Sequence, residues 1–134
     1  MLIRSALPGA PMRRGPVSRR SVPFAPPVDV VESQQALVFC AELAGLSEGD
    51  FEVTVDADTL TIKGEKKAAQ SPQSDDGARV LRHETVAGEF SRTYQLPFDA
   101  DSESVTATFR NGLLTVRVPK PAQPETRSIP IASA

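Results

Sequence analysis

Apolar residues recur at every second position between Val28 and Val118, as they do in β-strands that bury one face. The segment Phe51–Asp56 shows the pattern most cleanly, because its apolar residues alternate with acidic and hydroxyl side chains. The segment Leu37–Leu43 carries apolar residues at both parities, which predicts a strand buried on both faces. A helical stripe is absent from the sequence between these points, so the pattern predicts an all-β domain.

A two-residue hairpin is predicted at Asn111-Gly112, because this pair tolerates the positive φ angles that a type I′ turn requires at both central positions. A slip of one residue would move the apolar side chains to the opposite face, so the turn specifies the register. In this register the apolar pairs of one face are Phe109 with Leu114, Ala107 with Val116, and Val105 with Val118.

A second hairpin is predicted around Ala57-Asp58, although this pair is not a favoured type I′ sequence. Its register pairs Val55 with Leu60 and Val53 with Ile62, and it places Glu52 opposite Lys63. Further strands are expected at Val28–Glu32, Leu37–Leu43 and Phe90–Leu96. About seven strands, each with an apolar face to cover, predict an immunoglobulin-like sandwich of two sheets.

The formal net charge of −2 is unevenly distributed along the chain. Residues 1–27 contain five arginines, no acidic residue and six of the twelve prolines, so residues 28–134 carry a formal −7. The prolines exclude a regular helix or a central strand in this arm. Four interpretations stay open: a solvated tail, an arm that grips nucleic acid, an organellar targeting peptide, or an arm that docks on its own acidic domain or on partners. No aromatic residue lies among the arginines, which disfavours nucleic acid.

We therefore divide the chain into an arm (1–27), a strand domain (28–118) and a C-terminal tail (119–134). Prolines make the start of the tail extended. Three residues before its end the tail carries Ile129-Pro130-Ile131, whose two isoleucines are out of place among polar residues. They occur there by chance or form a short docking motif.

A long polar loop, residues 65–78, interrupts the strands and leads into the β-like run Arg79–Glu84, which has no obvious partner in its own sheet. Such an edge segment can pair with another chain. Arg92 shares its parity with Phe90 and Tyr94 and so points where apolar residues point. It either extends past a sheet edge or belongs to a buried or interfacial ion pair with a nearby acid.

The sequence excludes or disfavours several functional classes. One Cys and one His exclude a Cys/His zinc cluster and an internal disulfide, and no apolar run approaches the roughly 20 residues that span a bilayer. The sequence lacks a Walker A motif. Gly45–Gly49 matches the G-x-S-x-G of hydrolases, but a strand follows it instead of a helix, so a polar turn is favoured.

Short motifs follow one another in order along the chain, namely Pro27–Glu32, Glu42–Leu46 ("D/E-L-P-G"), Leu60–Lys66 ("L-x-I-x-G-E-K/R"), Gly88–Arg92 with Leu96-Pro97 ("G-x-F-x-R…L-P"), Ala107–Leu114 ("A-x-x-x-N-G-V/L-L") and Ile129–Ile131 ("I-x-I"). Each motif is weak alone, and the ordered set is specific. It resembles the small heat-shock proteins with an α-crystallin domain, in their bacterial form. Two positions depart from the family pattern: Ala44 stands in place of the usual Pro, and Thr85 in place of a basic residue.

The resemblance implies an ATP-independent holdase chaperone, located in the cytoplasm, that binds unfolding client proteins and itself and needs no cofactor, nucleic acid or membrane. A β-sandwich adaptor that binds one folded partner is the alternative. The loop 65–85 would exchange a strand between two subunits of a dimer. The implied dimer interface is Val80, Leu81, Arg82, Glu84 and Arg92, and the implied groove for the tail of a neighbouring dimer is Val53, Val55, Val105, Ala107 and Phe109.

Overall fold

The computed structural model describes residues 23–68, 79–123 and 125–134. Most of the basic arm and the centre of the long loop lie outside the described residues, so the expectations for them are not addressed. Within the described ranges the elements are β1 (Val28–Glu32), β2 (Ala36–Glu42), the 3₁₀ helix η1 (Glu48–Asp50), β3 (Phe51–Asp56), β4 (Thr59–Lys66), β5 (Gly88–Gln95), β6 (Thr106–Arg110) and β7 (Leu113–Pro119).

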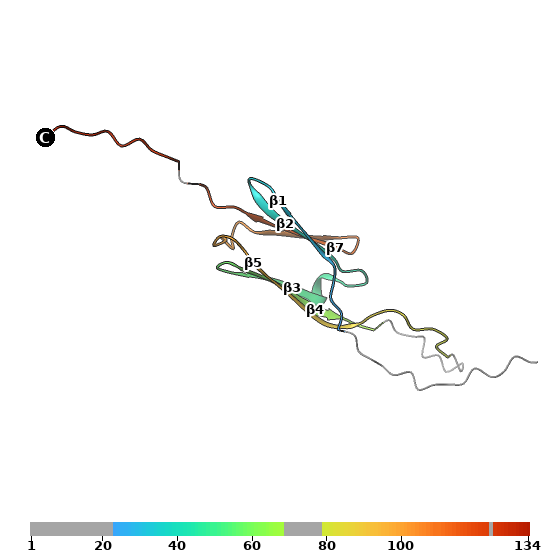
Figure 1. The fold of residues 1–134 in the computed structure, drawn as a ribbon. Helices are drawn as coiled ribbons and strands as arrows, with labels where there is room; N and C mark the ends of the chain where they lie inside the picture. The colour runs from blue at the N-terminus through green and yellow to red at the C-terminus, as the bar shows by residue number, and fades with distance from the viewer. Residues whose placement is uncertain (1–22, 69–78, 124) are drawn as a thin grey trace, which may run out of the picture.

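The strands form two antiparallel sheets that lie face to face (Figure 1). One sheet has the order β1-β2-β7-β6 and the other has the order β3-β4-β5. The predicted two-sheet β-sandwich is therefore confirmed.

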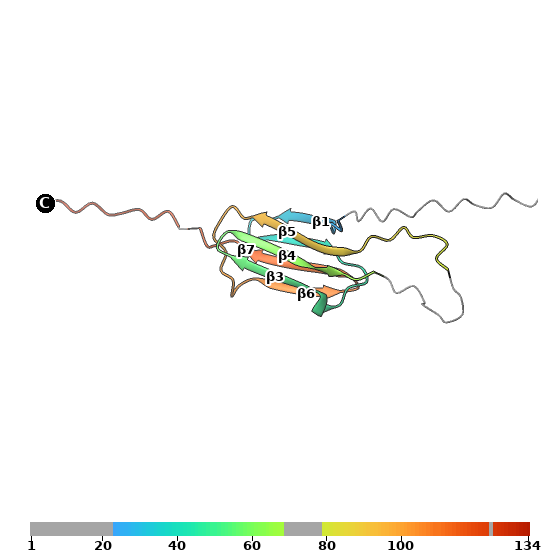
Figure 2. The same ribbon diagram turned by 90° about the horizontal axis from the view of Figure 1, so that it is seen from below.

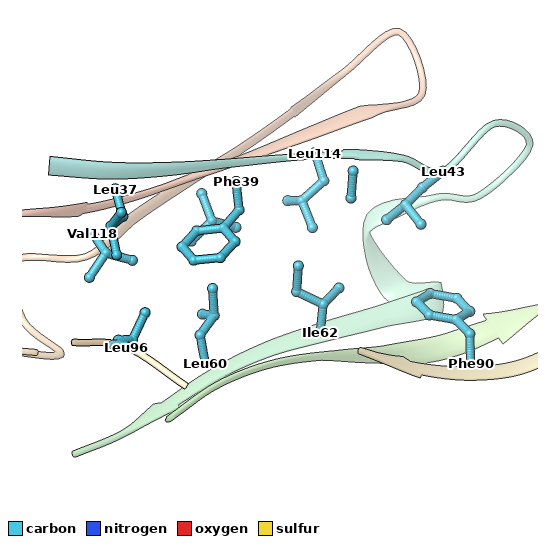
Figure 3. Packing of buried hydrophobic residues seen from close by; sticks show 11 residues of the cluster. Leu37, Phe39, Leu43, Leu60, Ile62, Phe90, Leu96, Leu114 and Val118 are labelled. Atoms are coloured by element: carbon cyan, nitrogen blue, oxygen red, sulfur yellow. The ribbon is translucent and has the colours of Figure 1, made fainter. Parts of the chain in front are cut away.

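The core lies between the inner faces of the two sheets. Leu60 and Ile62 of β4 point toward Phe39 of β2 and Leu114 of β7, and all four are at most 2% exposed (Figure 3). These residues sit at alternating positions, which is the period that the sequence showed. The rest of the buried cluster is Leu37, Ala41, Leu43, Phe90, Leu96, Val116 and Val118.

Both predicted hairpins form. Asn111 and Gly112 have φ angles of 53° and 78°, as a type I′ turn requires. Ala57 also adopts a positive φ, 51°, which is uncommon for a residue with a side chain. The ladders pair Phe109 with Leu114, Ala107 with Val116, Val55 with Leu60, Val53 with Ile62 and Glu52 with Lys63.

Two details differ from expectation. The β6–β7 ladder ends at Thr106 and Arg117, one residue before the expected pairing of Val105 with Val118. Within the predicted segment the strand β2 is fully buried on its inner face only: Val38 and Cys40 are half-buried, and of their parity Ala36 alone, just before that segment, is buried. Their side of the four-stranded sheet is not covered by the second sheet, so apolar residues at both parities did not mean two buried faces.

Gly64 in β4 allows the start of β3 to approach closely. A Cβ at this position would clash with the carbonyl oxygen of Asp50 and would lie 2.8 Å from the Cα and Cβ of Phe51. Backbone on both sides of the contact leaves little room for adjustment. Gly49, in contrast, has nothing within 4 Å of such a Cβ.

We expect Gly64→Ala to lower the free energy of unfolding by roughly 1–3 kcal/mol, because an added methyl group forces the two strands apart. The control Gly49→Ala should change it by less than about 0.5 kcal/mol. Urea unfolding of both variants at one protein concentration measures the difference. Equal values for the two glycines would show that the β3–β4 contact adjusts without cost.

Candidate interaction surfaces

The sandwich has two open sides, each bordered by one edge strand of each sheet. Strands β3 and β6 lie along one side, and β1 and β5 lie along the other (Figure 2). An edge strand exposes unpaired backbone groups and can pair with another chain. These two sides are therefore the candidate binding surfaces of the sandwich.

The side between β3 and β6 is apolar, and we call it the β3–β6 seam. Phe51 of β3 packs edge-on against Phe109 of β6, with ring centroids 4.9 Å apart, and this contact joins the two edges. Ala107 is exposed on the seam. The remaining residues expected in the tail groove are half-buried along it, namely Val53, Val55, Val105 and Phe109.

The opposite side carries two exposed valines. Val30 and Val31 of β1 are 47% and 58% exposed, although β1 pairs with β2 along its whole length. β1 is the end strand of its sheet, so its second edge has no partner strand among the described residues. The two valines interrupt the charges of this edge strand, Asp29 and Glu32, with apolar side chains that another strand could cover.

Arg92 lies on the same side, in β5. It is half-buried and faces inward between buried Phe90 and half-buried Tyr94, as its parity indicated. Its guanidinium carbon is 5.6 Å from the centroid of the Tyr94 ring, a cation–π geometry. Within the described ranges Arg92 makes no ion pair, and the buried Tyr94 hydroxyl has no hydrogen-bond partner.

The run Arg79–Glu84 is not a strand in the single chain. Val80 and Leu81 are 59% and 83% exposed. Arg82 and Glu84 form an ion pair 3.3 Å long, and both side chains are largely exposed. Exposed pairs of this kind contribute little to stability, so the segment is free to pair elsewhere.

The tail leaves the sandwich after β7 (Figure 1). Its root is fixed near the β1–β2 turn by two contacts of Lys120. The side-chain ammonium lies 2.6 Å from the Glu32 carboxylate, and the backbone N–H donates to the Gln35 carbonyl at 2.8 Å. Farther along, Ile129 and Ile131 are 80% and 97% exposed. The single chain thus leaves both isoleucines without cover.

The root of the arm makes contacts that sequence reasoning did not identify. Phe24 packs edge-on against Phe90 at 5.5 Å, beneath the Lys66 ammonium at 5.0 Å, and Pro26 is fully buried. Phe24, Pro26 and Val28 are covered, and the residues between them are exposed. The alternation of apolar positions in the strands therefore extends into the arm, N-terminal to β1. The high proline content of the arm obscured that signal.

The hydrolase-like motif is a turn, as the sequence favoured. Gly45 has a φ of 81°, and the Ser47 hydroxyl donates to Asp50 at 2.8 Å. A second bond, from the Ser47 N–H to the same carboxylate, helps to hold the pKa of Asp50 below its ordinary value. A 3₁₀ turn and a strand follow, so Ser47 caps a turn and does not stand on a nucleophile elbow.

Within the described ranges no group of three His, Cys, Asp or Glu side chains is arranged to hold a metal ion. None of the helices described there has the length and apolar character that crossing a membrane requires. The geometry is that of a β-sandwich whose apolar edges, loop and tail are available for binding other chains.

Comparison with known proteins identifies the class. The model of the Hsp20/alpha crystallin family matches residues 29–132, so the chain belongs to this family. The spore protein SP21 of Stigmatella aurantiaca is 33% identical over 122 residues, which cover 91% of this chain and 68% of that protein.

Solved structures agree in fold. A small heat-shock protein from Xylella fastidiosa, described as having a distinct high order structure, matches with a TM-score of 0.65 and 34% identity over 82% of this chain and 98% of its own. Heat shock protein 16.0 from Schizosaccharomyces pombe matches with a TM-score of 0.67 and 32% identity over 83% of this chain and 100% of its own.

The predicted family is therefore confirmed, and membership supports a chaperone role. Small heat-shock proteins are ATP-independent chaperones and not enzymes. The expectation that this chain carries no catalytic site follows from its family.

Proposed function

We propose that this protein is a holdase, which binds partly unfolded proteins under stress and keeps them from aggregating. The supporting observation is the distribution of exposed apolar side chains. Six of the eight large exposed hydrophobic residues among the described ones lie on the β1 edge, in the loop or in the tail, in the pairs Val30 and Val31, Val80 and Leu81, and Ile129 and Ile131. Exposed apolar surface of this kind is typical of sites that bind other chains.

The proposed building block is a dimer formed by exchanged strands. The run Arg79–Glu84 of one subunit would add to the free edge of β1 in the other, where Val30 and Val31 would cover Val80 and Leu81. This arrangement would satisfy the unpaired backbone of both segments. It would also bring the exchanged run close to Arg92, because β1 and β5 border the same side of the sandwich (Figure 2).

The proposed larger assembly uses the tail. Ile129 and Ile131 would enter the β3–β6 seam of a neighbouring dimer, on the same side of an extended chain that Pro130 stiffens. The roughly ten residues between β7 and Ile129 reach about 30 Å at 3.1 Å each. A cytoplasmic location completes the proposal, because the single cysteine, Cys40, is free and therefore suits a reducing compartment.

The function is tested by mixing the protein with a heat-labile enzyme and following light scattering during heating. We expect suppression that is the same with and without ATP, because no nucleotide site is part of the proposed mechanism. Suppression that requires ATP would contradict the proposal. A monomer without any suppression would favour an adaptor that binds one folded partner.

For the dimer, we expect Arg92→Ala to weaken association at least about tenfold, roughly 1.4 kcal/mol, because an acid such as Glu84 of the other subunit would lose its partner. Arg117→Ala is the matched control, since Arg117 is exposed on the outer face of β7. Sedimentation over a range of concentrations gives both dissociation constants. If the two variants behave alike, Arg92 contributes only its contact with Tyr94.

For the tail, we expect the double substitution Ile129→Ser and Ile131→Ser to reduce the assembly to dimers or small oligomers. Each isoleucine buried is worth roughly 1.5–3 kcal/mol, and many tails act together. The β-rich circular dichroism should persist while the mass falls. Ala132→Ser with Ala134→Ser, in the same tail, should leave the mass unchanged.

Substitutions in the β3–β6 seam test the same contact from the other side. Ala107 is exposed on the seam, so Ala107→Glu should block the tail without disturbing the core. Thr108→Glu, at the exposed neighbouring position on the opposite face of β6, is its control. An assembly that keeps its full mass after both tail isoleucines are replaced would rule out the tail contact.

A further inference from the structure

The root of the arm is held by side chains and hardly by its backbone. Three of its five residues, Pro23, Pro26 and Pro27, have no N–H to donate, and the segment 23–27 belongs to no strand. One backbone bond fixes its end, from the Glu42 N–H to the Pro27 carbonyl at 3.0 Å. Phe24 can therefore leave without breaking a sheet.

Phe24 sits in a small aromatic seat. The edge-on contact with Phe90 has an interplanar angle of 88° at 5.5 Å, and the Lys66 ammonium lies 5.0 Å from the centroid of the Phe24 ring. An aromatic neighbour and a cation over the ring face are both specific for an aromatic side chain. We call Lys66 and Phe90 together the Phe24 seat.

The seat closes one end of the core. Phe90 lies opposite Leu43 at the end of the row of buried side chains, away from Leu37 and Leu96 (Figure 3). Lys66 ends β4 and pairs with Gly88 at the start of β5, so the seat also stands at the base of the long loop. Departure of Phe24 would uncover one side of Phe90, which is only 6% exposed while Phe24 is present.

We propose that the Phe24 seat is a binding site for an aromatic side chain of an extended, unfolding client segment, and that the chain's own Phe24 occupies it at rest. This inference rests on the holdase function proposed above. Unfolding proteins expose aromatic residues that are normally buried, which supplies a ligand of the required chemistry. Phe24 and the client compete for the seat. The apparent dissociation constant of a client is therefore its intrinsic value divided by the fraction of seats that Phe24 leaves open.

A labelled peptide with the sequence of residues 22–27, Val-Pro-Phe-Ala-Pro-Pro, serves as the probe. In fluorescence anisotropy it should bind the Phe24→Ala protein at least about tenfold more tightly than the wild type, because the seat of the variant is always open. The same peptide with Ala in place of Phe should bind neither protein. Equal binding of the peptide to both proteins, or equal binding of the two peptides, overturns the proposal.

Two neighbouring lysines provide a matched pair. In the Phe24→Ala background, Lys66→Gln should weaken peptide binding roughly two- to fivefold through loss of the cation–π contact. Lys67→Gln should leave it unchanged, since the Lys67 side chain is 78% exposed and its only ion pair with another described residue, Asp50, is 4.0 Å long. Circular dichroism and melting curves establish that each variant is folded before binding is compared.

Client protection separates this inference from the holdase function itself. If the wild type suppresses aggregation, Phe24→Ala should do so at a lower temperature or at a lower ratio of chaperone to client. An unchanged threshold would overturn the role of the seat and leave the holdase intact. If the wild type suppresses nothing, the holdase proposal fails, and the peptide measurement still decides whether the seat binds aromatic side chains.

Discussion

The packing of β4 against the two central strands of the opposite sheet is the contact on which the rest of the structure depends. Leu60 and Ile62 are completely buried against a layer that includes Phe39, Leu114 and Val116. Each such side chain contributes roughly 1.5–3 kcal/mol when it is removed from water. With a single cysteine and no internal disulfide, the domain relies on this interface to hold its sheets together. Burial is concentrated on the central strands, and the edges contribute less to it.

Because the core is built by the central strands, the edge strands are available for contacts with other chains. Natural sheets usually protect their edges with charges, bulges or covering loops. Here β1 presents Val30 and Val31, and the seam between β3 and β6 presents half-buried apolar residues with Ala107 exposed. Substitutions at these positions can change binding without opening the core. The contacts proposed between chains would cover these exposed apolar residues, which accounts for their presence in a small domain.

Turn chemistry and period-two alternation predicted most of the fold. Asn111-Gly112 set a register that the ladder reproduces from Arg110 to Thr106, because positive φ at both positions admits few alternatives. Apolar content alone predicted the burial of β2 less well, since Val38 and Cys40 face outward and are only half-buried. The docking of Phe24 was missed because prolines are normally a sign of irregular chain, and tertiary packing overrode that local signal. The roles proposed for Arg92 and the tail depend on other chains, which one sequence describes only through its resemblance to a family.

Different segments leave the two ends of the sandwich, and the contacts proposed for them differ in symmetry. The arm root and the long loop leave from one end, and the tail leaves from the other, where Lys120 holds it beside Glu32 (Figure 2). Strand exchange is reciprocal, so two subunits related by a twofold axis would satisfy it completely. A tail that enters the seam of a neighbour is a head-to-tail contact, which a dimer leaves unsatisfied and which must continue until a ring or cage closes. If the chain makes both proposed contacts, it forms closed assemblies of dimers. Its weak tail contacts would open first on heating, while the sandwich stays folded.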